Sequence, residues 1–158
     1  MAKKLLVHRI LPPPFALLLG IFLIYYAERH LPFGQFMLPG QRSLALVLFF
    51  ISLLLMLRAA WRMKRAHTTL NPLIPERSQR LVTEGIFQRS RNPIYLADAI
   101  ILAGMVFWFG QWVGILVVAA FVIYINQVQI PTEERILATL FGEQYAEYCR
   151  RVPRWWSR

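Results

Sequence analysis

The chain has 158 residues, of which 57% are hydrophobic and 16% are charged, and its mean hydropathy is +0.44. A soluble domain of this length would carry more charge, and the apolar residues here form long runs that are typical of membrane spans. The net charge of +10 is carried by basic residues that flank these runs, which favours a membrane protein over nucleic-acid binding. The single cysteine, Cys149, excludes an internal disulfide bond.

Two apolar runs predict the first two membrane spans. Residues 10–27 follow a basic start that resembles a signal peptide, but no small-residue cleavage site comes after them, so we expect a retained span. Residues 44–61 are an almost unbroken run of leucine, phenylalanine, valine and isoleucine. Both runs approach the length of about 17 to 20 residues that a bilayer core requires. A short loop with prolines and glycines separates them.

A polar stretch and a second pair of apolar runs follow. Residues 62–92 are too polar to cross a bilayer and predict a loop. Residues 93–109 and 111–130 are apolar and are separated only by Gly110, which predicts a tight helical hairpin. The start of its first helix and the end of its second must then lie side by side.

The last part of the chain is predicted to lie on the membrane surface. We expect Pro131 to break the chain after the hairpin, because proline disrupts a helix interior. Residues 132–149 then read as an amphipathic helix. Its apolar side comprises Ile136, Leu137, Leu140, Phe141 and Tyr145. The basic and aromatic tail, residues 150–156, suits the headgroup zone.

These elements predict one all-α membrane domain, a helical bundle with four transmembrane spans and a C-terminal amphipathic helix. Its parts are two N-terminal spans (1–61), a loop (62–92), a helical hairpin (93–130), and the amphipathic helix with its tail (131–158). Eight of the 18 basic residues lie in or beside the middle loop, namely Arg58, Arg62, Lys64, Arg65, Arg77, Arg80, Arg89 and Arg91. The third loop has none, so we expect the middle loop and both termini in the cytoplasm, in a bacterial inner membrane.

Polar residues gather at both ends of the predicted hairpin. Arg91, Asn92 and Tyr95 stand where its first helix begins, and Gln129 and the Glu133–Glu134 pair stand where its second helix ends. The hairpin therefore brings the two groups together at the cytoplasmic surface. Buried amides and carboxylates near a membrane are costly and usually face a cavity or a partner, so we favour a ligand site.

Several polar residues allow a structural explanation instead. Glu134 and Arg135 could equally be helix-end residues that reach toward water. Asp98, one turn beyond Tyr95, could be an interfacial residue paired with an arginine or could be functional. Gly85 is most simply a turn residue, and its alternative is close backbone approach to a ligand. The three histidines have no metal-site spacing.

The second half of the chain resembles the isoprenylcysteine carboxyl methyltransferases and phospholipid N-methyltransferases, a family of integral membrane methyltransferases. The resemblance spans about residues 81–156. It rests on four motifs in order: the turn around Gly85 and Phe87 with Arg91-Asn92-Pro93-Ile94-Tyr95, the Glu133-Glu134 pair, Phe141-Gly142-Glu143-Gln144-Tyr145-Ala146-Glu147-Tyr148, and Arg151-Val152-Pro153-Arg154-Trp155. Asn92 stands where many relatives have histidine.

The resemblance implies binding of S-adenosylmethionine in a cytoplasmic-side pocket that the C-terminal amphipathic helix covers. It also implies methylation of a lipophilic acceptor from the bilayer: a prenylcysteine-type carboxylate, a thiol or a lipid headgroup. It implies cofactor contacts from Leu81, Val82, Gly85, Phe87, Arg91, Asn92, Tyr95, Gln129, Glu133 and Glu134, and catalytic roles for Arg151 and Glu134. The cofactor carries two cationic groups and a carboxylate, which carboxylates and arginine suit. Membrane lipids are the other expected partners.

Two alternatives remain open at this stage. Membrane sterol reductases have a similar C-terminal half and use NADPH, whose 2′-phosphate would call for basic residues such as those of the middle loop. A non-catalytic membrane protein with a vestigial pocket is the second alternative.

Overall fold

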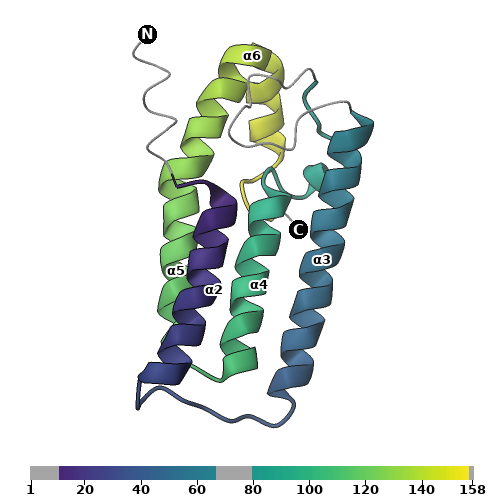
Figure 1. Cartoon of the computed structure of the whole chain (residues 1–158). Coiled ribbons are helices and arrows are strands. Elements are labelled where there is room, and N and C mark those ends of the chain that lie inside the picture. Colours follow the sequence, from purple (N-terminus) through teal and green to yellow (C-terminus); the bar gives the residue numbers. More distant parts are fainter. Residues whose placement is uncertain (1–10, 67–79, 157–158) are drawn as a thin grey trace.

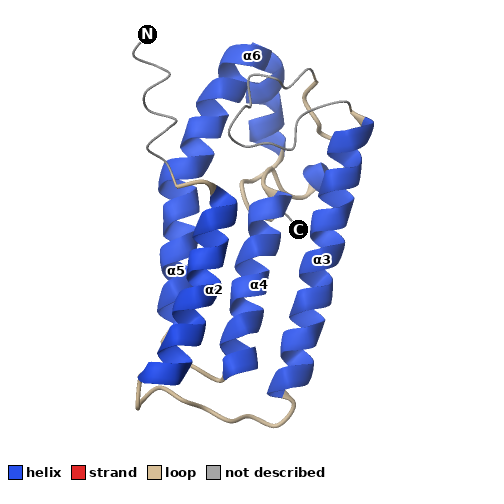
Figure 2. Ribbon diagram, viewed as in Figure 1, coloured by secondary structure: helices blue, strands red, loops and turns tan. Residues whose placement is uncertain are grey.

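The computed structural model describes residues 11–66 and 80–156 as a bundle of helices (Figures 1 and 2). Within these residues there is no strand, only an isolated bridge between Gln35 and Gln111. The helical elements are α2 (Pro13–His30), α3 (Gln41–Arg65), η2 (Gly85–Gln88), α4 (Pro93–Phe109), α5 (Gly114–Tyr124), η3 (Ile125–Gln129) and α6 (Ile130–Arg151). The all-α prediction is confirmed, and α4 has the bounds expected for the first hairpin helix. The basic N-terminus and part of the middle loop lie outside the described residues.

The long helices alternate in direction, with α4 placed between α3 and α2 in Figure 1. The start of α2, the end of α3, the start of α4 and all of α6 lie at the same end of the bundle. We call this end the site end. Short loops join α2 to α3 and α4 to α5, and neighbouring helices joined by few residues must run antiparallel.

Small side chains let α3 and α4 approach closely. The residues that α3 buries are Ala45, Ser52 and Ala59, each seven positions after the last. The Ser52 hydroxyl donates a hydrogen bond of 2.9 Å to the carbonyl of Ala97 on α4. Such small-residue seams are typical of helices that pack inside a membrane, where van der Waals contact and interhelical hydrogen bonds drive association.

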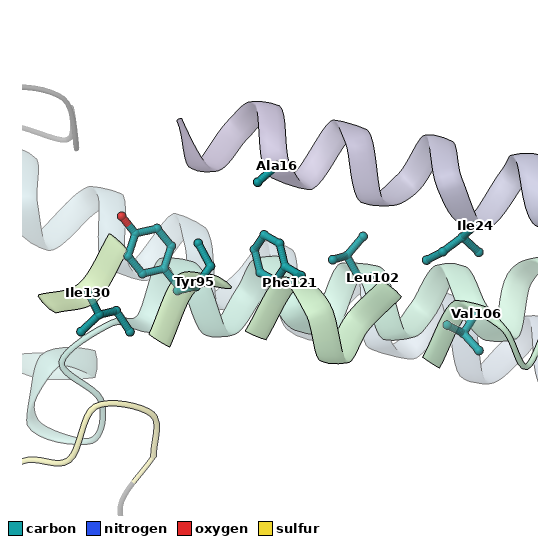
Figure 3. Packing of buried hydrophobic residues seen from close by; sticks show 8 residues of the cluster. Ala16, Ile24, Tyr95, Leu102, Val106, Phe121 and Ile130 are labelled. Atoms are coloured by element: carbon teal, nitrogen blue, oxygen red, sulfur yellow. The ribbon is translucent and has the colours of Figure 1, made fainter. Parts of the chain in front are cut away.

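A larger apolar core lies among α2, α4 and α5 (Figure 3). Leu102 of α4 packs against Gly20 of α2, where an added Cβ would lie 2.9 Å from a leucine methyl carbon. Figure 3 shows Phe121 between Tyr95 and Leu102 along the bundle. The hydroxyl group of Tyr95 therefore points out of the core at the site end.

Among the described residues, two helices are long and apolar enough to cross a membrane: α3, and the helix that begins at Gly114 and runs through η3 into α6. The apolar α4 is shorter, at 17 residues. Many large apolar side chains of α2 and α3 are exposed, including Phe15 and Phe50. An outward apolar face of this size suits contact with lipid tails.

The far end of the bundle is closed by Gln111. Its side chain is fully buried and donates to the carbonyls of Phe33 (3.2 Å) and Ala27 (3.4 Å). Its side-chain oxygen accepts from the backbone N–H of Val113. One amide thus ties the loop before α3 to the turn between α4 and α5.

The expectation that Pro131 breaks the chain is wrong. Helix α5 passes through the π-helical segment η3 directly into α6, in which Pro131 occupies the first turn. Proline is tolerated in a first turn, and a π segment adds the slack that relieves the clash between its ring and the preceding turn. Asn126, Gln129 and Glu133 therefore lie on one uninterrupted helix.

The α3–α4 seam yields a stability prediction. Replacing Ser52 with Leu forces a larger side chain against α4 and removes the hydrogen bond to Ala97. We expect the free energy of unfolding to fall by about 1 to 3 kcal/mol. The same change at Ser43, an exposed position on α3, should alter it by less than about 0.5 kcal/mol. Denaturant unfolding in detergent measures both values, and equal values for the two variants would contradict a packed seam.

Candidate functional site

The loop that leads into α4 is shaped by a glycine turn. Gly85 has a φ of 64°, a left-handed conformation that glycine adopts readily. The Arg62 side chain lies against this residue, on the side where a Cβ would sit, and its guanidinium is 3.3 Å from the Glu84 carboxylate. Here Gly85 is a turn residue, and its close neighbour is the protein's own arginine.

Helix α6 reverses direction at Gly142. This residue has φ 51° and ψ −125°, a combination closed to other residues without strain, and an added Cβ would meet no atom within 4 Å. The amphipathic helix expected over residues 132–149 is therefore not continuous. It is two helical segments, and we call the second one, residues 143–151, the return segment.

The return segment packs onto the loop before α4. Tyr145, Tyr148 and Val152 form a buried apolar cluster against which Leu81 packs, together with Leu137 and Phe141 of the first segment of α6. The Tyr148 hydroxyl donates a 2.7 Å hydrogen bond to the carbonyl of Phe87. Of the five residues predicted on the apolar side, Ile136 and Leu140 lie outside this cluster, and Leu140 is 43% exposed.

The residues after the return segment are bound along the start of α4. We call residues 152–156 the strap. The backbone N–H of Arg91 donates to the carbonyl of Pro153 at 3.0 Å. The side chains of Ser90 and Asn92 both donate to the carbonyl of Arg154, at 3.3 and 3.1 Å. Asn92 thus holds the strap in place through its amide nitrogen.

A three-residue ion cluster lies where α4, α6 and the strap meet. The Glu134 carboxylate accepts two hydrogen bonds from Arg154, at 2.9 and 2.6 Å, and lies 2.9 Å from a guanidinium nitrogen of Arg91. The hydrogen bonds to Glu134 raise the pKa of the Arg154 guanidinium above its usual value, so this guanidinium stays charged. The side chains of Arg91 and Glu134 are only 12% and 21% exposed, so solvent screens their attraction weakly.

A second carboxylate is held by neutral groups. One oxygen of Glu133 accepts hydrogen bonds from the Tyr95 hydroxyl and, at 2.7 Å, from the amide of Gln129. Among the described residues Glu133 forms no ion pair. Its negative charge is therefore oriented but not neutralised.

The structure brings together most of the residues predicted for the site. Arg91, Asn92 and Tyr95 meet Gln129, Glu133 and Glu134 at the site end, and Leu81 and Phe87 adjoin them through the return segment. Val82 is half-buried in the same loop. Arg151 lies apart: its side chain is 67% exposed and 3.8 Å from Glu147, which is also exposed.

Several site residues were not predicted. Arg154 binds Glu134, and it also reaches the side-chain oxygen of Asn126 at 3.5 Å. One nitrogen of Arg91 contacts the Tyr145 hydroxyl and the sulfur of Cys149, a residue to which the sequence assigned no role in the site. The only sequence signal for Arg154 was its place in the Arg-Val-x-Arg-Trp motif, and the reversal at Gly142 decides which arginine of that motif turns inward.

One buried polar atom in the site has no partner. The Nε of Arg91 is buried, and no described residue offers it a hydrogen-bond acceptor. Leaving a buried donor unsatisfied is costly, and such atoms are often where a ligand binds. An anionic ligand group would satisfy this one.

Comparison with known proteins identifies the family of the chain. Residues 41–144 match the phospholipid methyltransferase family. The chain belongs to this family. It is also 35% identical over 89 residues to Protein-S-isoprenylcysteine O-methyltransferase B of Arabidopsis thaliana, which covers 56% of the chain and 45% of that protein.

Two further relatives share shorter stretches. Protein-S-isoprenylcysteine O-methyltransferase of Schizosaccharomyces pombe is 33% identical over 73 residues, or 46% of the chain and 31% of that protein. An uncharacterized protein of Haemophilus influenzae is 37% identical over 65 residues, or 39% of the chain and 98% of that protein. The chain spans less than half the length of the two isoprenylcysteine methyltransferases, and no solved structure matches it significantly.

The reversal in α6 yields a prediction that uses Cys149 as a probe. An Ala at Gly142 strains the backbone by about 1 to 3 kcal/mol without a steric clash, so it should loosen the docking of the return segment. We expect the only thiol of the chain to react faster with a maleimide. Glu143→Ala, one residue further on and exposed, is the matched control and should leave the rate unchanged. A Gly142→Ala variant labelled at the parent rate would show that the reversal needs no glycine.

The two arginines of the C-terminal motif give a paired prediction. Arg154→Gln should lower the free energy of unfolding by about 1 to 2 kcal/mol, because a partly buried, charge-assisted contact to Glu134 is lost. Arg151→Gln should lower it by less than about 0.5 kcal/mol, because that side chain is exposed. Thermal melts in detergent compare the two variants. A larger loss of stability in Arg151→Gln than in Arg154→Gln would mean that Arg151, and not Arg154, holds the strap.

Proposed function

We propose that this chain is an S-adenosylmethionine-dependent methyltransferase whose acceptor is a lipophilic molecule of the membrane. The observation that carries the proposal is that one site contains both a carboxylate without a cationic partner and a guanidinium nitrogen without an acceptor. Glu133 has a negative charge with no described cation beside it, and Arg91 has a buried donor with no described acceptor. Membership of the phospholipid methyltransferase family supports the same reaction.

The residues of the site fit the charges of this cofactor. Glu133 would bind a cationic group, and Gln129 and Tyr95 would keep its carboxylate in position. The free Nε of Arg91 would bind the cofactor carboxylate, since guanidinium groups suit planar anions. Backbone groups of the loop that carries Leu81, Val82, Gly85 and Phe87 would line the rest of the cofactor. Asn92 would support the site indirectly, by holding the strap in place.

Methyl transfer needs little acid or base chemistry from the protein. When bound, the cofactor supplies an electrophilic methyl group, and the protein must position an acceptor in line with it and exclude water. The apolar cluster of Tyr145, Tyr148 and Val152 supports water exclusion by covering the loop from the site end.

We assign different roles to the two residues that the family resemblance connects with catalysis. Both oxygens of Glu134 are engaged by arginines, so we propose that Glu134 positions Arg91 and the strap. Arg151 would reach the site only by leaving Glu147, and we propose that it does so when an acceptor is present.

We further propose that the bundle crosses the membrane four times, with α2, α3, α4 and α5 as its spans and the site end in the cytoplasm. Two observations support this: the start of α2, the end of α3 and the start of α4 lie at the same end of the bundle, and the middle loop at that end is basic. The acceptor would then enter from the bilayer, and its reacting group would meet the cofactor at the level of Tyr95.

Calorimetry distinguishes this function from an NADPH-dependent reductase. We expect saturable binding of S-adenosylmethionine and of its demethylated product to the purified protein, and no binding of NADPH. Saturable NADPH binding without any response to the methyl donor would overturn the proposal.

A substitution at Glu133 tests the site itself. Glu133→Gln keeps the shape but removes the charge, so cofactor affinity should fall about ten- to hundredfold, as for loss of a charge-assisted contact of roughly 1.5 to 3 kcal/mol. Glu143→Gln, whose side chain is 79% exposed, should bind as the parent does. Thermal melts confirm that both variants fold. If Glu133→Gln binds as tightly as the parent, Glu133 is not a cofactor ligand.

A further inference from the structure

A third acidic residue lies deeper in the bundle than Glu133 and Glu134. Asp98 is on α4, three residues after Tyr95 and four residues before Leu102, so all three share one face of the helix. It lies about 4.5 Å further along the helix axis than Tyr95, given the rise of an α-helix. Tyr95 and Leu102 both belong to the apolar core, and Asp98 is only 5% exposed.

The carboxyl group of Asp98 is not explained by the fold. Within residues 11–66 and 80–156 it takes part in no ion pair, and no side chain or backbone group of these residues donates a hydrogen bond to it. Glu133 and Glu134 differ from Asp98, because Glu133 accepts hydrogen bonds from two groups and Glu134 is paired with two arginines. A carboxyl group buried at membrane depth is costly, and such residues usually face a substrate or ion path.

We propose that Asp98 binds the nitrogen of an amine-headed lipophilic acceptor, so that the chain methylates an amine and not a carboxylate. The inference rests on the proposed function. Asp98 lies on the membrane side of Tyr95, where a molecule from the bilayer would arrive, while the cofactor groups lie on the other side. An ammonium group would gain an ion pair there, and an acceptor carboxylate would be repelled in a region of low dielectric constant.

The same contact supplies a proton acceptor. An ammonium nitrogen has no lone pair, so it must first pass a proton to the Asp98 carboxylate by breaking an N–H bond. The lone pair that this leaves on the nitrogen then forms the new N–C bond to the methyl group of the sulfonium donor. The C–S bond breaks, and its electrons remain on sulfur as a neutral thioether. The product is a methylated ammonium, and no further reactant is required.

The first arm of the test measures binding without the cofactor. The protein is placed in phosphatidylcholine nanodiscs that contain hexadecylamine, hexadecanoic acid or hexadecanol, and its thermal midpoint is recorded. We expect the amine to raise the midpoint relative to the alcohol, and the acid to leave it unchanged. In Asp98→Asn the amine effect should disappear, and in Asp98→Glu it should return in part.

The stability of the variant itself separates a binding role from a structural one. In the absence of amine, Asp98→Asn should leave the thermal midpoint unchanged or raise it by about 2 to 4 °C, because burying a neutral amide is less unfavourable than burying a carboxyl group without a partner. Glu143→Gln, which removes an exposed charge, should keep the full response to the amine. An Asp98→Asn variant that melts well below the parent and still responds to the amine would overturn the proposal, since Asp98 would then serve only the fold.

The second arm follows transfer of labelled methyl from S-adenosylmethionine to each lipid. We expect transfer to the amine alone, reduced by about tenfold or more in Asp98→Asn, with cofactor affinity unchanged by calorimetry. Transfer to the acid in preference to the amine would overturn this inference and leave the proposed function standing. Failure of the parent to bind the cofactor would sink the proposed function, whereas the amine-induced shift would still decide the role of Asp98.

Discussion

The carboxylate of Glu134 is the contact on which the rest of the site depends. It joins Arg91 at the start of α4 to Arg154 in the strap, and it is itself carried by α6. Three segments that are distant in sequence are thus held by one group of charges. Because a partly buried carboxylate is unfavourable without its partners, the loss of either arginine affects the position of the other two segments. The backbone bonds of the strap and the tyrosines of the return segment are arranged around this contact.

Much of this arrangement follows from the sequence, and the reason is geometric. Two apolar runs of similar length with one glycine between them must form a hairpin, so Tyr95 and Glu133 had to meet at its open end. The hydrogen bonds from Tyr95 and Gln129 to Glu133 agree with that prediction. The sequence could not show which of two neighbouring glutamates keeps a free charge, because that depends on where Arg154 lies.

The errors have one physical origin, which is the path of the chain after α5. Proline usually ends a helix, but a π-helical segment before Pro131 supplies the room that its ring needs. Gly142 then makes the sharp reversal that a proline would be expected to mark. Composition does not distinguish a glycine that serves as a spacer in a helix from one with φ 51°. The reversal turns Arg154 inward and leaves Arg151 exposed, so the identity of the buried arginine could not be predicted.

The carboxyl groups of Glu134, Glu133 and Asp98 differ in how fully they are paired with positive charge or hydrogen-bond donors, and this difference gives the site its direction. Glu134 is balanced by two guanidinium groups and holds the scaffold together. Glu133 is bound by a hydroxyl and an amide, which orient its charge and leave it available to a cation. Asp98, one turn deeper, lies in the apolar core without a described partner. The carboxyl groups therefore have fewer partners from the strap toward the bilayer, which suits a cationic cofactor group at Glu133 and an ammonium that approaches from the membrane at Asp98. Burying these carboxyl groups lowers the stability of the fold. Gln111, the α3–α4 seam and the apolar core offset this loss, because they stabilise the bundle away from the site.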